Sequence, residues 1–311
     1  MTHTVLTDWD SAKAAAFEKE NIVAHHNMHD REIFSDEGLI ELLDRYPRER
    51  MGIYTMQIDN PLDRRSFRAG NAFGLTGAEL LRAVEDGRIW INMRNANDYV
   101  PAYEGLTEEL FDSVEAGTPG LKTLKHDTSI LISSPNAQVF YHFDVPLVML
   151  WQIRGVKNVW LYPPEEPYLT DHQLETVVLK ETEEEIDFEM AYDRGAQKVR
   201  LEPGMVATWP QNGPHRIVNE DMVNVSLSCE FQTLQSLVRA NAIYANGVLR
   251  RNFGMNPRIS DHGPLGLYSK AFLARFFKIL KLRKSFELKV PRTFEVDPGS
   301  ENAVRDIQPQ T

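Results

Sequence analysis

The chain has 311 residues, of which 42% are hydrophobic and 25% charged, a balance typical of a globular protein of one or two domains. Its formal net charge of −11 argues against general binding to nucleic acid or to an anionic membrane. A single cysteine, Cys229, excludes a disulfide framework and a thiolate metal site. There is neither a signal-peptide pattern nor an apolar run near the roughly 20 residues that span a bilayer. The sequence therefore predicts no transmembrane segment and a cytoplasmic location.

The first third of the chain mixes helical and strand-like patterns. Residues 1–50 are predicted to form a polar N-terminal helical segment that closes at Pro47. Residues 51–58, MGIYTMQI, predict a strand because they are rich in β-branched and aromatic types. Residues 77–95 contain a predicted helix, GAELLRAVEDG, followed by a second apolar piece, RIWINM.

Beyond about residue 128, short runs of strand-forming residues alternate with turn signals such as SPNA, EPG and PQNGP. Several short strands at this spacing predict a β-sandwich or barrel. The predicted fold class is therefore mainly β with flanking helices. The runs are TSILIS, QVFYHFDV, LVMLWQIR, KNVWLYPP, KVRLEP, MVATWP and NVSLSCEF.

An acidic insertion at 165–189 interrupts the strands. It carries ten acidic residues and one lysine, Lys180. A solvated loop is the simpler interpretation, and a role in holding a basic substrate is the alternative.

Residues 236–296 are predicted to form a C-terminal helical region, followed by a loose tail at 297–311. Within it, basic residues surround an apolar face of the segment 268–286. Packing against a domain or a second subunit, as in a homodimer, is the favoured interpretation, and a membrane-surface helix or a nucleic-acid contact are alternatives. The apolar positions are Phe272, Leu273, Phe276, Phe277 and Leu280, and the basic ones are Lys270, Arg275, Lys278, Lys281, Arg283 and Lys284.

The residues with the clearest chemistry are His142 and Asp144 in YHFDVP and His215 in WPQNGPHRI. Residues at i and i+2 of a strand point to the same face, so His142 and Asp144 offer a nitrogen and an oxygen to one point. Two histidines and one carboxylate form the facial triad of non-haem Fe(II) oxygenases. Such pairs also occur by chance, and a lone buried histidine is more often a hydrogen-bonded core residue.

Lys157 lies in the otherwise apolar strand KNVWLY. A buried lysine is unfavourable unless it is paired, and a carboxylate of a bound 2-oxo acid would provide the pair. The alternative is a lysine that points to solvent at the start of a hairpin.

These motifs resemble those of the JmjC/cupin-like family of Fe(II)- and 2-oxoglutarate-dependent oxygenases. That family includes the asparaginyl hydroxylase that inhibits hypoxia-inducible factor and bacterial cupin-like relatives. The shared pattern is His-x-Asp, then Gln-Ile-basic-Gly-x-Lys, then an aromatic-Pro-Pro end, which appears here as HFD, QIRGVK and WLYPP. The resemblance covers roughly 50–235 and is best over 128–231. It implies a double-stranded β-helix (jelly-roll or cupin) core over 51–235.

By this resemblance, His142, Asp144 and His215 are the metal ligands and Lys157 anchors the distal carboxylate of 2-oxoglutarate. Tyr54 is a further candidate for cosubstrate binding, because MGIYTMQI resembles a family strand with a tyrosine in that role. No other catalytic residue is assigned. Two family positions differ, since Val139 replaces a threonine and Val148 an asparagine found in some relatives. Ser226 and Ser228 are candidates for lining the pocket.

The function implied is an Fe(II)- and 2-oxoglutarate-dependent oxygenase of the hydroxylase type. Its partners would be dioxygen, 2-oxoglutarate and an unidentified primary substrate, either a polypeptide or a small molecule. Two rival interpretations remain open at this stage. One is a cupin-like module that binds metal as a sensor or scaffold without catalysis. The other is a cupin enzyme of a different kind, in which Lys157 would have no evident role.

Overall fold

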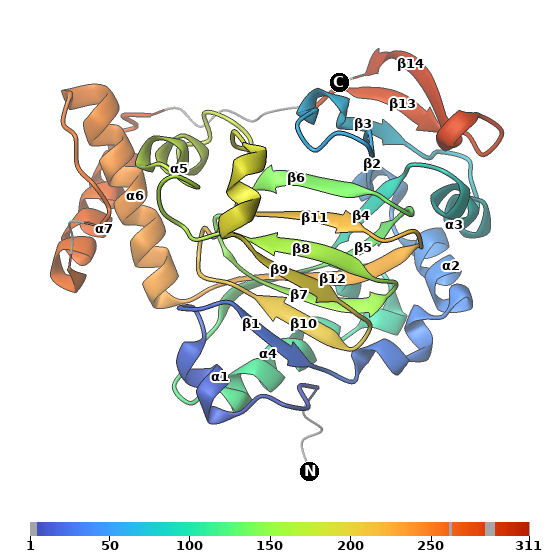
Figure 1. Cartoon of the computed structure of the whole chain (residues 1–311), viewed down its shortest axis with the longest axis horizontal. Coiled ribbons are helices and arrows are strands. Elements are labelled where there is room, and N and C mark those ends of the chain that lie inside the picture. The colour runs from blue at the N-terminus through green and yellow to red at the C-terminus, as the bar shows by residue number, and fades with distance from the viewer. Residues whose placement is uncertain (1–4, 261–262, 284–289, 311) are drawn as a thin grey trace.

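The computed structural model describes residues 5–260, 263–283 and 290–310 of the chain. Strands in these ranges form two sheets that face each other (Figure 1). The larger has ten strands in the order β1-β10-β7-β12-β5-β4-β2-β3-β13-β14, and the smaller has four in the order β6-β11-β8-β9. The strands are β1 Ile22–His25, β2 Gly52–Thr55, β3 Arg68–Asn71, β4 Trp90–Arg94, β5 Leu124–Ser133, β6 Gln138–His142, β7 Leu147–Arg154, β8 Lys157–Leu161, β9 Gln197–Leu201, β10 Met205–Thr208, β11 His215–Asn219, β12 Asn224–Gln232, β13 Arg292–Val296 and β14 Val304–Gln310.

The chain crosses repeatedly between the two sheets from β5 to β12. Strands β5, β7, β10 and β12 belong to the large sheet, and β6, β8, β9 and β11 belong to the small one. This alternation is the double-stranded β-helix, so the predicted core is confirmed. The expected runs from TSILIS to NVSLSCEF supply seven of these eight strands, and the eighth, β11, lies in none of the runs.

Strand β7 shows how one sequence serves two hydrophobic cores. Its residues from Leu147 to Ile153 are all buried, although strands that face solvent on one side alternate. Met149 and Trp151 pack toward the outer core, whereas Val148 and Leu150 belong to the cluster between the sheets. Successive side chains of a strand point to opposite faces, so this division follows from the period of two.

Helices cover the outer face of the large sheet. The leucines of α2 and α3 share the outer core with Ile130 and Ile132 of β5. Both helices begin at a side-chain cap, because the Ser35 hydroxyl accepts from the Gly38 amide and Thr76 forms a capping box with Glu79. The helices are α1 Ser11–Ala16, α2 Asp36–Arg45, α3 Gly77–Asp86, α4 Leu106–Gly117, α5 Asp171–Val178, α6 Leu234–Phe253 and α7 Pro264–Ile279.

The two ends of the chain differ from the sequence-based expectation. The segment 1–50, predicted to be helical, also contributes β1 to the edge of the large sheet beside β10. The tail 297–311, predicted to be loose, contains β14, which pairs with β13. Polar composition favoured a tail, but Phe294 of β13 is fully buried against Gly70 of β3, and this anchor brings β13 and β14 onto the sheet.

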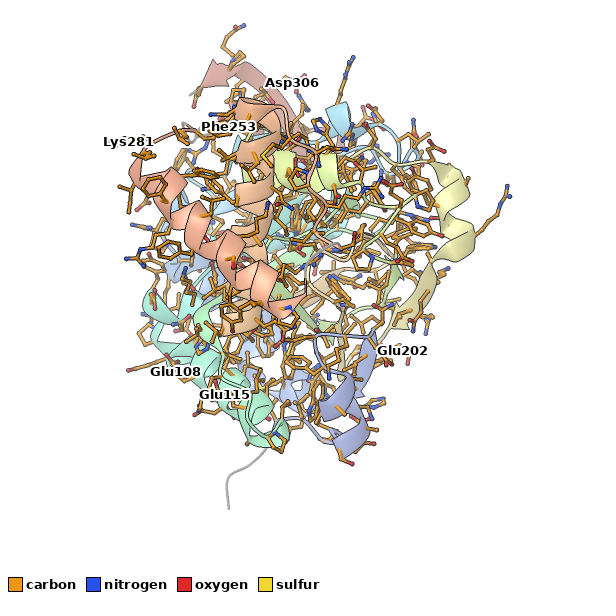
Figure 2. All side chains as sticks on the ribbon, turned by 90° about the vertical axis from the view of Figure 1, so that its left-hand side faces the viewer. Glu108, Glu115, Glu202, Phe253, Lys281 and Asp306 are labelled. Carbon is orange, nitrogen blue, oxygen red and sulfur yellow. The ribbon has the colours of Figure 1, made fainter. Side chains whose placement is uncertain are left out.

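Helices α6 and α7 form a hairpin beside the β-helix, on the left of Figure 1 and facing the viewer in Figure 2. Glu175 of α5 is almost completely buried and holds Arg250 and Arg251 of α6 by ion pairs. Of the apolar face predicted over 268–286, only Phe277 is buried, whereas Phe272 is 76% exposed. The predicted apolar face is therefore present on the helix, but most of its side chains are exposed and do not pack against the rest of the chain. Residues 284–286, including Lys284, lie outside the described ranges.

The acidic insertion is folded rather than extended. Its helix α5 starts at a capping box between Thr170 and Gln173. Further along, Glu185 forms an antiparallel bridge with His142, and the Ile186 amide donates to the Tyr141 carbonyl. The insertion thus returns to β6, next to the predicted metal ligands. No helix within the described residues is long and apolar enough to cross a membrane.

Candidate metal centre and its cavity

Strand pairing brings the predicted ligands together. His142 is the last residue of β6, Asp144 follows two positions later, and His215 is the first residue of β11. Because β6 and β11 are antiparallel neighbours, His215 lies directly opposite His142. His215 comes 71 positions after Asp144, so the two residues are distant in sequence but close in space.

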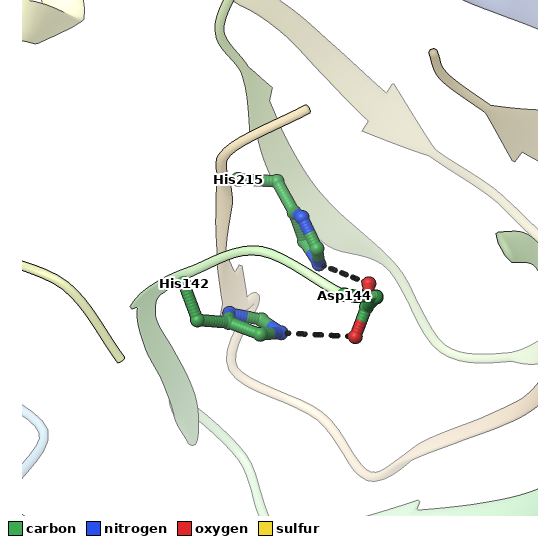
Figure 3. A group of neighbouring side chains, drawn as sticks. All are labelled: His142, Asp144 and His215. Carbon is green, nitrogen blue, oxygen red and sulfur yellow. Dashed lines mark ion pairs between the residues drawn. The ribbon is translucent and has the colours of Figure 1, made fainter. Parts of the chain in front are cut away.

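The three side chains point toward one another (Figure 3). Nε2 of His142 lies 3.8 Å from Oδ1 of Asp144, and Nε2 of His215 lies 3.5 Å from Oδ2. One potential ligand atom from each residue lies within 4.8 Å of the others. Nitrogen and oxygen ligands bind Fe or Zn at about 2 Å, so donors about 3–4 Å apart suit one shared ion.

Backbone hydrogen bonds fix the direction of both imidazoles. Nδ1 of His142 lies 2.8 Å from the Phe140 carbonyl, and Nδ1 of His215 lies 3.1 Å from the Gly213 carbonyl. A carbonyl only accepts, so each Nδ1 carries the proton and each Nε2 presents a lone pair to the Asp144 carboxylate. Three acceptors that converge without a shared proton repel one another, and a cation between them would remove this repulsion. Metal-bound histidines in proteins are commonly oriented in this way.

Burial perturbs the acid–base properties of this group. It lowers the pKa of His215 well below its usual value, and the neighbouring His142 adds to this effect. Burial also raises the pKa of Asp144, an effect that His142 opposes. The site therefore disfavours separate charges on its own residues, as expected where a metal supplies the missing positive charge.

The turn WPQNGP aligns His215 with the other two ligands. The Asn212 side chain donates to the Asp144 carbonyl at 3.0 Å, and the Gln211 side chain donates to the Val145 carbonyl at 3.0 Å. The ring of Trp209 lies 4.4 Å from the ring of His215. Sequence reasoning treated this turn as a Pro/Gly-rich connection, whereas its polar side chains tie the two ligand-bearing segments together.

The triad opens into a cavity of about 570 Å³ between the sheets. Val139, Val148 and Leu150 all line it, so the three apolar residues face inward. Ser228 lines it as well, whereas Ser226 does not; the Ser226 hydroxyl instead donates to the Gln152 side chain at 2.7 Å. The remaining lining residues are Tyr54, Phe67, Trp90, Asn92, Arg94, Ser129, Leu131, Phe140, His142, Asp144, Glu183, Glu184, Glu185, Trp209, His215, Ile217, Glu230 and Val290.

Lys157 is 4% exposed and lies on β8 with the same parity as Val159 and Leu161, which pack between the sheets. It therefore points inward, and the solvent-facing alternative is wrong. No described residue gives its ammonium group an ion pair or hydrogen bond, and burial lowers its pKa to about 7. Lys157 is not among the residues that line the cavity. Its cross-strand neighbour on β11 is Asn219, two residues after Ile217, and Ile217 does line the cavity.

Tyr54 lies on β2 opposite Trp90 of β4, and its ring lines the cavity. The ring stacks on Phe67 at 4.8 Å and lies 5.1 Å from Trp90. Burial raises the pKa of its hydroxyl group, so the Tyr54 side chain keeps its proton at neutral pH.

Strand β4 contributes residues that sequence reasoning missed. Trp90, Asn92 and Arg94 face the cavity, whereas the alternate residues Ile91 and Met93 are fully buried in the outer core. The signal was present as alternation of W-x-N-x-R with two apolar residues. Polar residues that alternate with apolar ones on a strand inside a sheet indicate that the polar face lines a cavity.

The acidic residues of the cavity influence one another. Burial and the nearby carboxylates, Asp144 first, raise the pKa of Glu184 to about 8 and that of Glu230 to about 7. Arg94 partly opposes this, and its guanidinium group is already paired with Asp127. These carboxyl groups therefore resist ionisation near neutral pH, because each negative charge beside the triad disfavours the next.

No protein-family model matches the sequence, and no curated protein matches it. Among solved structures, the X-ray structure of ycfD from Escherichia coli is 15% identical, with a TM-score of 0.51. The match covers 90% of this chain and 69% of that chain. Another structure, described as YcfD, a ribosomal oxygenase from Escherichia coli in complex with cobalt and 2-oxoglutarate, is 16% identical with a TM-score of 0.44. This match covers 85% of this chain and 64% of that chain.

The chain therefore spans about two thirds of the length of these proteins. At this identity, the likeness to ycfD shows the fold alone. It agrees with the double-stranded β-helix observed here and with the fold that the sequence resemblance implied.

Proposed function

We propose that this protein is an Fe(II)- and 2-oxoglutarate-dependent oxygenase of the JmjC/cupin-like type that hydroxylates its substrate. The observation that carries the proposal is the convergence of two imidazole lone pairs and one carboxylate beside a cavity. A facial set of two histidines and one carboxylate leaves coordination positions open for other ligands. YcfD, which shares the fold, is described as a ribosomal oxygenase and has been seen with cobalt and 2-oxoglutarate. We also propose a cytoplasmic location.

In this proposal His142, Asp144 and His215 hold the metal. When bound, iron and 2-oxoglutarate supply the oxidising chemistry that uses dioxygen. The protein supplies position and dryness. The Phe140 and Gly213 carbonyls hold the imidazoles in the required tautomer, and the side chains of Val139, Val148 and Leu150 exclude water from the cavity wall.

Lys157 is proposed to bind the distal carboxylate of 2-oxoglutarate. Its ammonium group is buried and lacks a described partner, so a dicarboxylate would provide the charge-assisted contact that burial otherwise denies it. Tyr54 is proposed to add a hydroxyl contact from β2. Because two family positions are occupied here by Val139 and Val148, the cosubstrate would rely more heavily on Lys157.

The deciding experiment measures turnover of 2-oxoglutarate without a primary substrate. Purified protein is incubated with Fe(II), ascorbate and 2-oxoglutarate, and succinate is quantified by mass spectrometry. Succinate that depends on Fe(II) and on active protein supports the oxygenase. Tight Mn(II) binding by electron paramagnetic resonance, with no succinate and no binding of N-oxalylglycine, would instead favour the metal-binding sensor or scaffold.

We also propose a homodimer through the exposed apolar stripe of α7. Contiguous apolar residues exposed on a protein surface are a common feature of protein–protein interfaces. Replacing Phe272 at the middle of the stripe by aspartate should convert the dimer to a monomer in sedimentation-velocity experiments. A wild-type protein that is monomeric at tens of micromolar would show that this proposal is wrong. The stripe consists of Leu265, Tyr268, Phe272, Phe276 and Ile279, each more than half exposed.

A further inference from the structure

Asp144 is held in place differently from the two histidines of the triad. Strand β6 ends at His142 and β7 begins at Leu147, so Asp144 lies in the connection between two strands. The backbone contact of this connection with the insertion, from the Phe143 amide to the Glu184 carbonyl, is long at 3.4 Å. A ligand carried by a connection depends on other contacts to keep its carboxylate aligned.

Two side-chain amides of the turn before His215 supply such contacts. Asn212 donates to the Asp144 carbonyl at 3.0 Å, and Gln211 donates to the next carbonyl along the chain, that of Val145, at 3.0 Å. Both amide-bearing residues are buried, where hydrogen bonds are electrostatically stronger than in water. The turn that carries one metal ligand therefore fixes two successive peptide groups at another.

Gln211 also connects this turn to helix α6. Its side-chain amide donates at 3.1 Å to the carbonyl of Ser236, in the first turn of that helix. The first turn is closed by a capping box between Thr233 and Ser236, and it follows directly on β12. The contacts to Asp144 and Val145 are therefore anchored on a regular element, so the connection cannot shift without disturbing α6.

Turn geometry alone does not account for an asparagine at position 212. Its φ of 63° lies in the left-handed region, which glycine adopts more readily than asparagine. Its side-chain oxygen is buried and receives no hydrogen bond from any described residue, an unfavourable state that glycine would avoid. The one contribution of Asn212 that glycine cannot replace is the N–H donor to the Asp144 carbonyl.

From these contacts we infer that Gln211 and Asn212 are positioning residues of the metal centre, which hold the Asp144 carboxylate between the imidazoles of His142 and His215. Neither residue lines the cavity, so both act through Asp144. The inference rests on the proposed function, because it takes the triad as the metal site. Loss of a residue that supports a metal ligand typically weakens metal binding about 10–100-fold.

The test is the affinity of the full chain for Co(II), measured by isothermal titration calorimetry in Asn212→Gly and Gln211→Met after circular dichroism has shown both to be folded. Glycine keeps the left-handed φ and methionine keeps the side-chain length, so each variant mainly removes a donor. We expect the affinity to fall at least about tenfold in each variant. The visible absorption of bound Co(II), which reports coordination geometry, should change as well. Wild-type affinity and absorption in both variants would overturn the inference.

Asn136→Gly is the matched control. Asn136 also has a left-handed φ, of 60°, and its side chain also donates one hydrogen bond, to Asp221, but it lies outside the cavity lining and away from the triad. Its substitution should leave Co(II) affinity and absorption unchanged. An equal loss in this control would mean that any weakened turn has the same effect, and this too would overturn the inference.

A double-mutant cycle separates positioning from a general loss of structure. In a protein that already carries Asp144→Ala, two histidines remain to bind Co(II), and Asn212→Gly should change the affinity by less than about twofold. A further loss as large as in the wild-type background would show that Asn212 does not act through Asp144, and would overturn the inference. Wild-type protein that binds no Co(II) would reject the proposed function together with the inference. Wild-type protein that binds Co(II) and forms succinate, with both variants equal to it, would reject the inference alone.

Discussion

Replacing His215 by alanine is expected to abolish metal-dependent turnover. The variant leaves two donors at a site that presents three, and loss of a ligand should weaken Fe(II) or Mn(II) binding by at least about 100-fold, since loss of a supporting residue alone costs 10–100-fold. Succinate formation should fall to the background. Mn(II) binding by electron paramagnetic resonance and succinate by mass spectrometry measure the two effects separately.

The matched control is His172→Ala, because His172 is an exposed histidine on α5 outside the cavity lining. It should keep wild-type metal binding and turnover. His215 is buried, so circular dichroism must show that its variant is folded. A folded His215→Ala protein that binds Mn(II) as the wild type does would exclude the proposed triad.

Replacing Lys157 by methionine is expected to separate stability from function. In the absence of 2-oxoglutarate the variant should melt at least about 3 °C higher than the wild type, because a buried ammonium group without a partner is destabilising by a few kcal/mol. Methionine fills a similar volume without charge. The same variant should raise the KM for 2-oxoglutarate at least about 100-fold, since a charge-assisted anchor is lost. Metal binding should remain.

The pH dependence of this stability difference has a definite sign. The pKa of Lys157 is about 7 in the folded protein, and that of lysine in an unfolded chain is near 10.5. Below pH 7 both states are protonated and the full penalty for burying the charge is present. As pH rises from 7 to 10.5 the folded state is neutral while the unfolded state still binds the proton, so the penalty shrinks. The melting temperatures of wild type and variant should therefore converge toward pH 10.

Lys198→Met is the control for both measurements. Lys198 is an exposed residue on β9 whose ammonium lies over the Trp160 ring. Its loss should change neither the KM for 2-oxoglutarate nor the pH dependence. An unchanged KM in Lys157→Met would show that another group anchors the cosubstrate, even if the stability effect is found.

The sequence by itself determined the features that depend on neighbours in the chain. The strand period of two predicted that His142 and Asp144 point the same way; the two side chains do converge, although β6 ends at His142 and Asp144 follows it. The turn signals delimit the strands of the double-stranded β-helix. The inward direction of Lys157 also agrees with its place in an apolar strand. Short strands with turns between them specify a sandwich or barrel, and the family-like motifs narrowed it to this core.

Only the tertiary structure decided which distant segments share a cavity. The pairing of β6 with β11, the return of Glu185 to His142, and the placement of Trp90, Asn92 and Arg94 on the inner face all depend on long-range register. The alternation of polar and apolar residues along β4 predicts one polar and one apolar face, but it does not predict which face lies toward the metal site. The apolar stripe of α7 has the same sequence pattern whether it packs inside the chain or faces outward, and only the fold shows that it is exposed. Hydrophobic periodicity defines a face, whereas its partner is set by the packing of the whole chain.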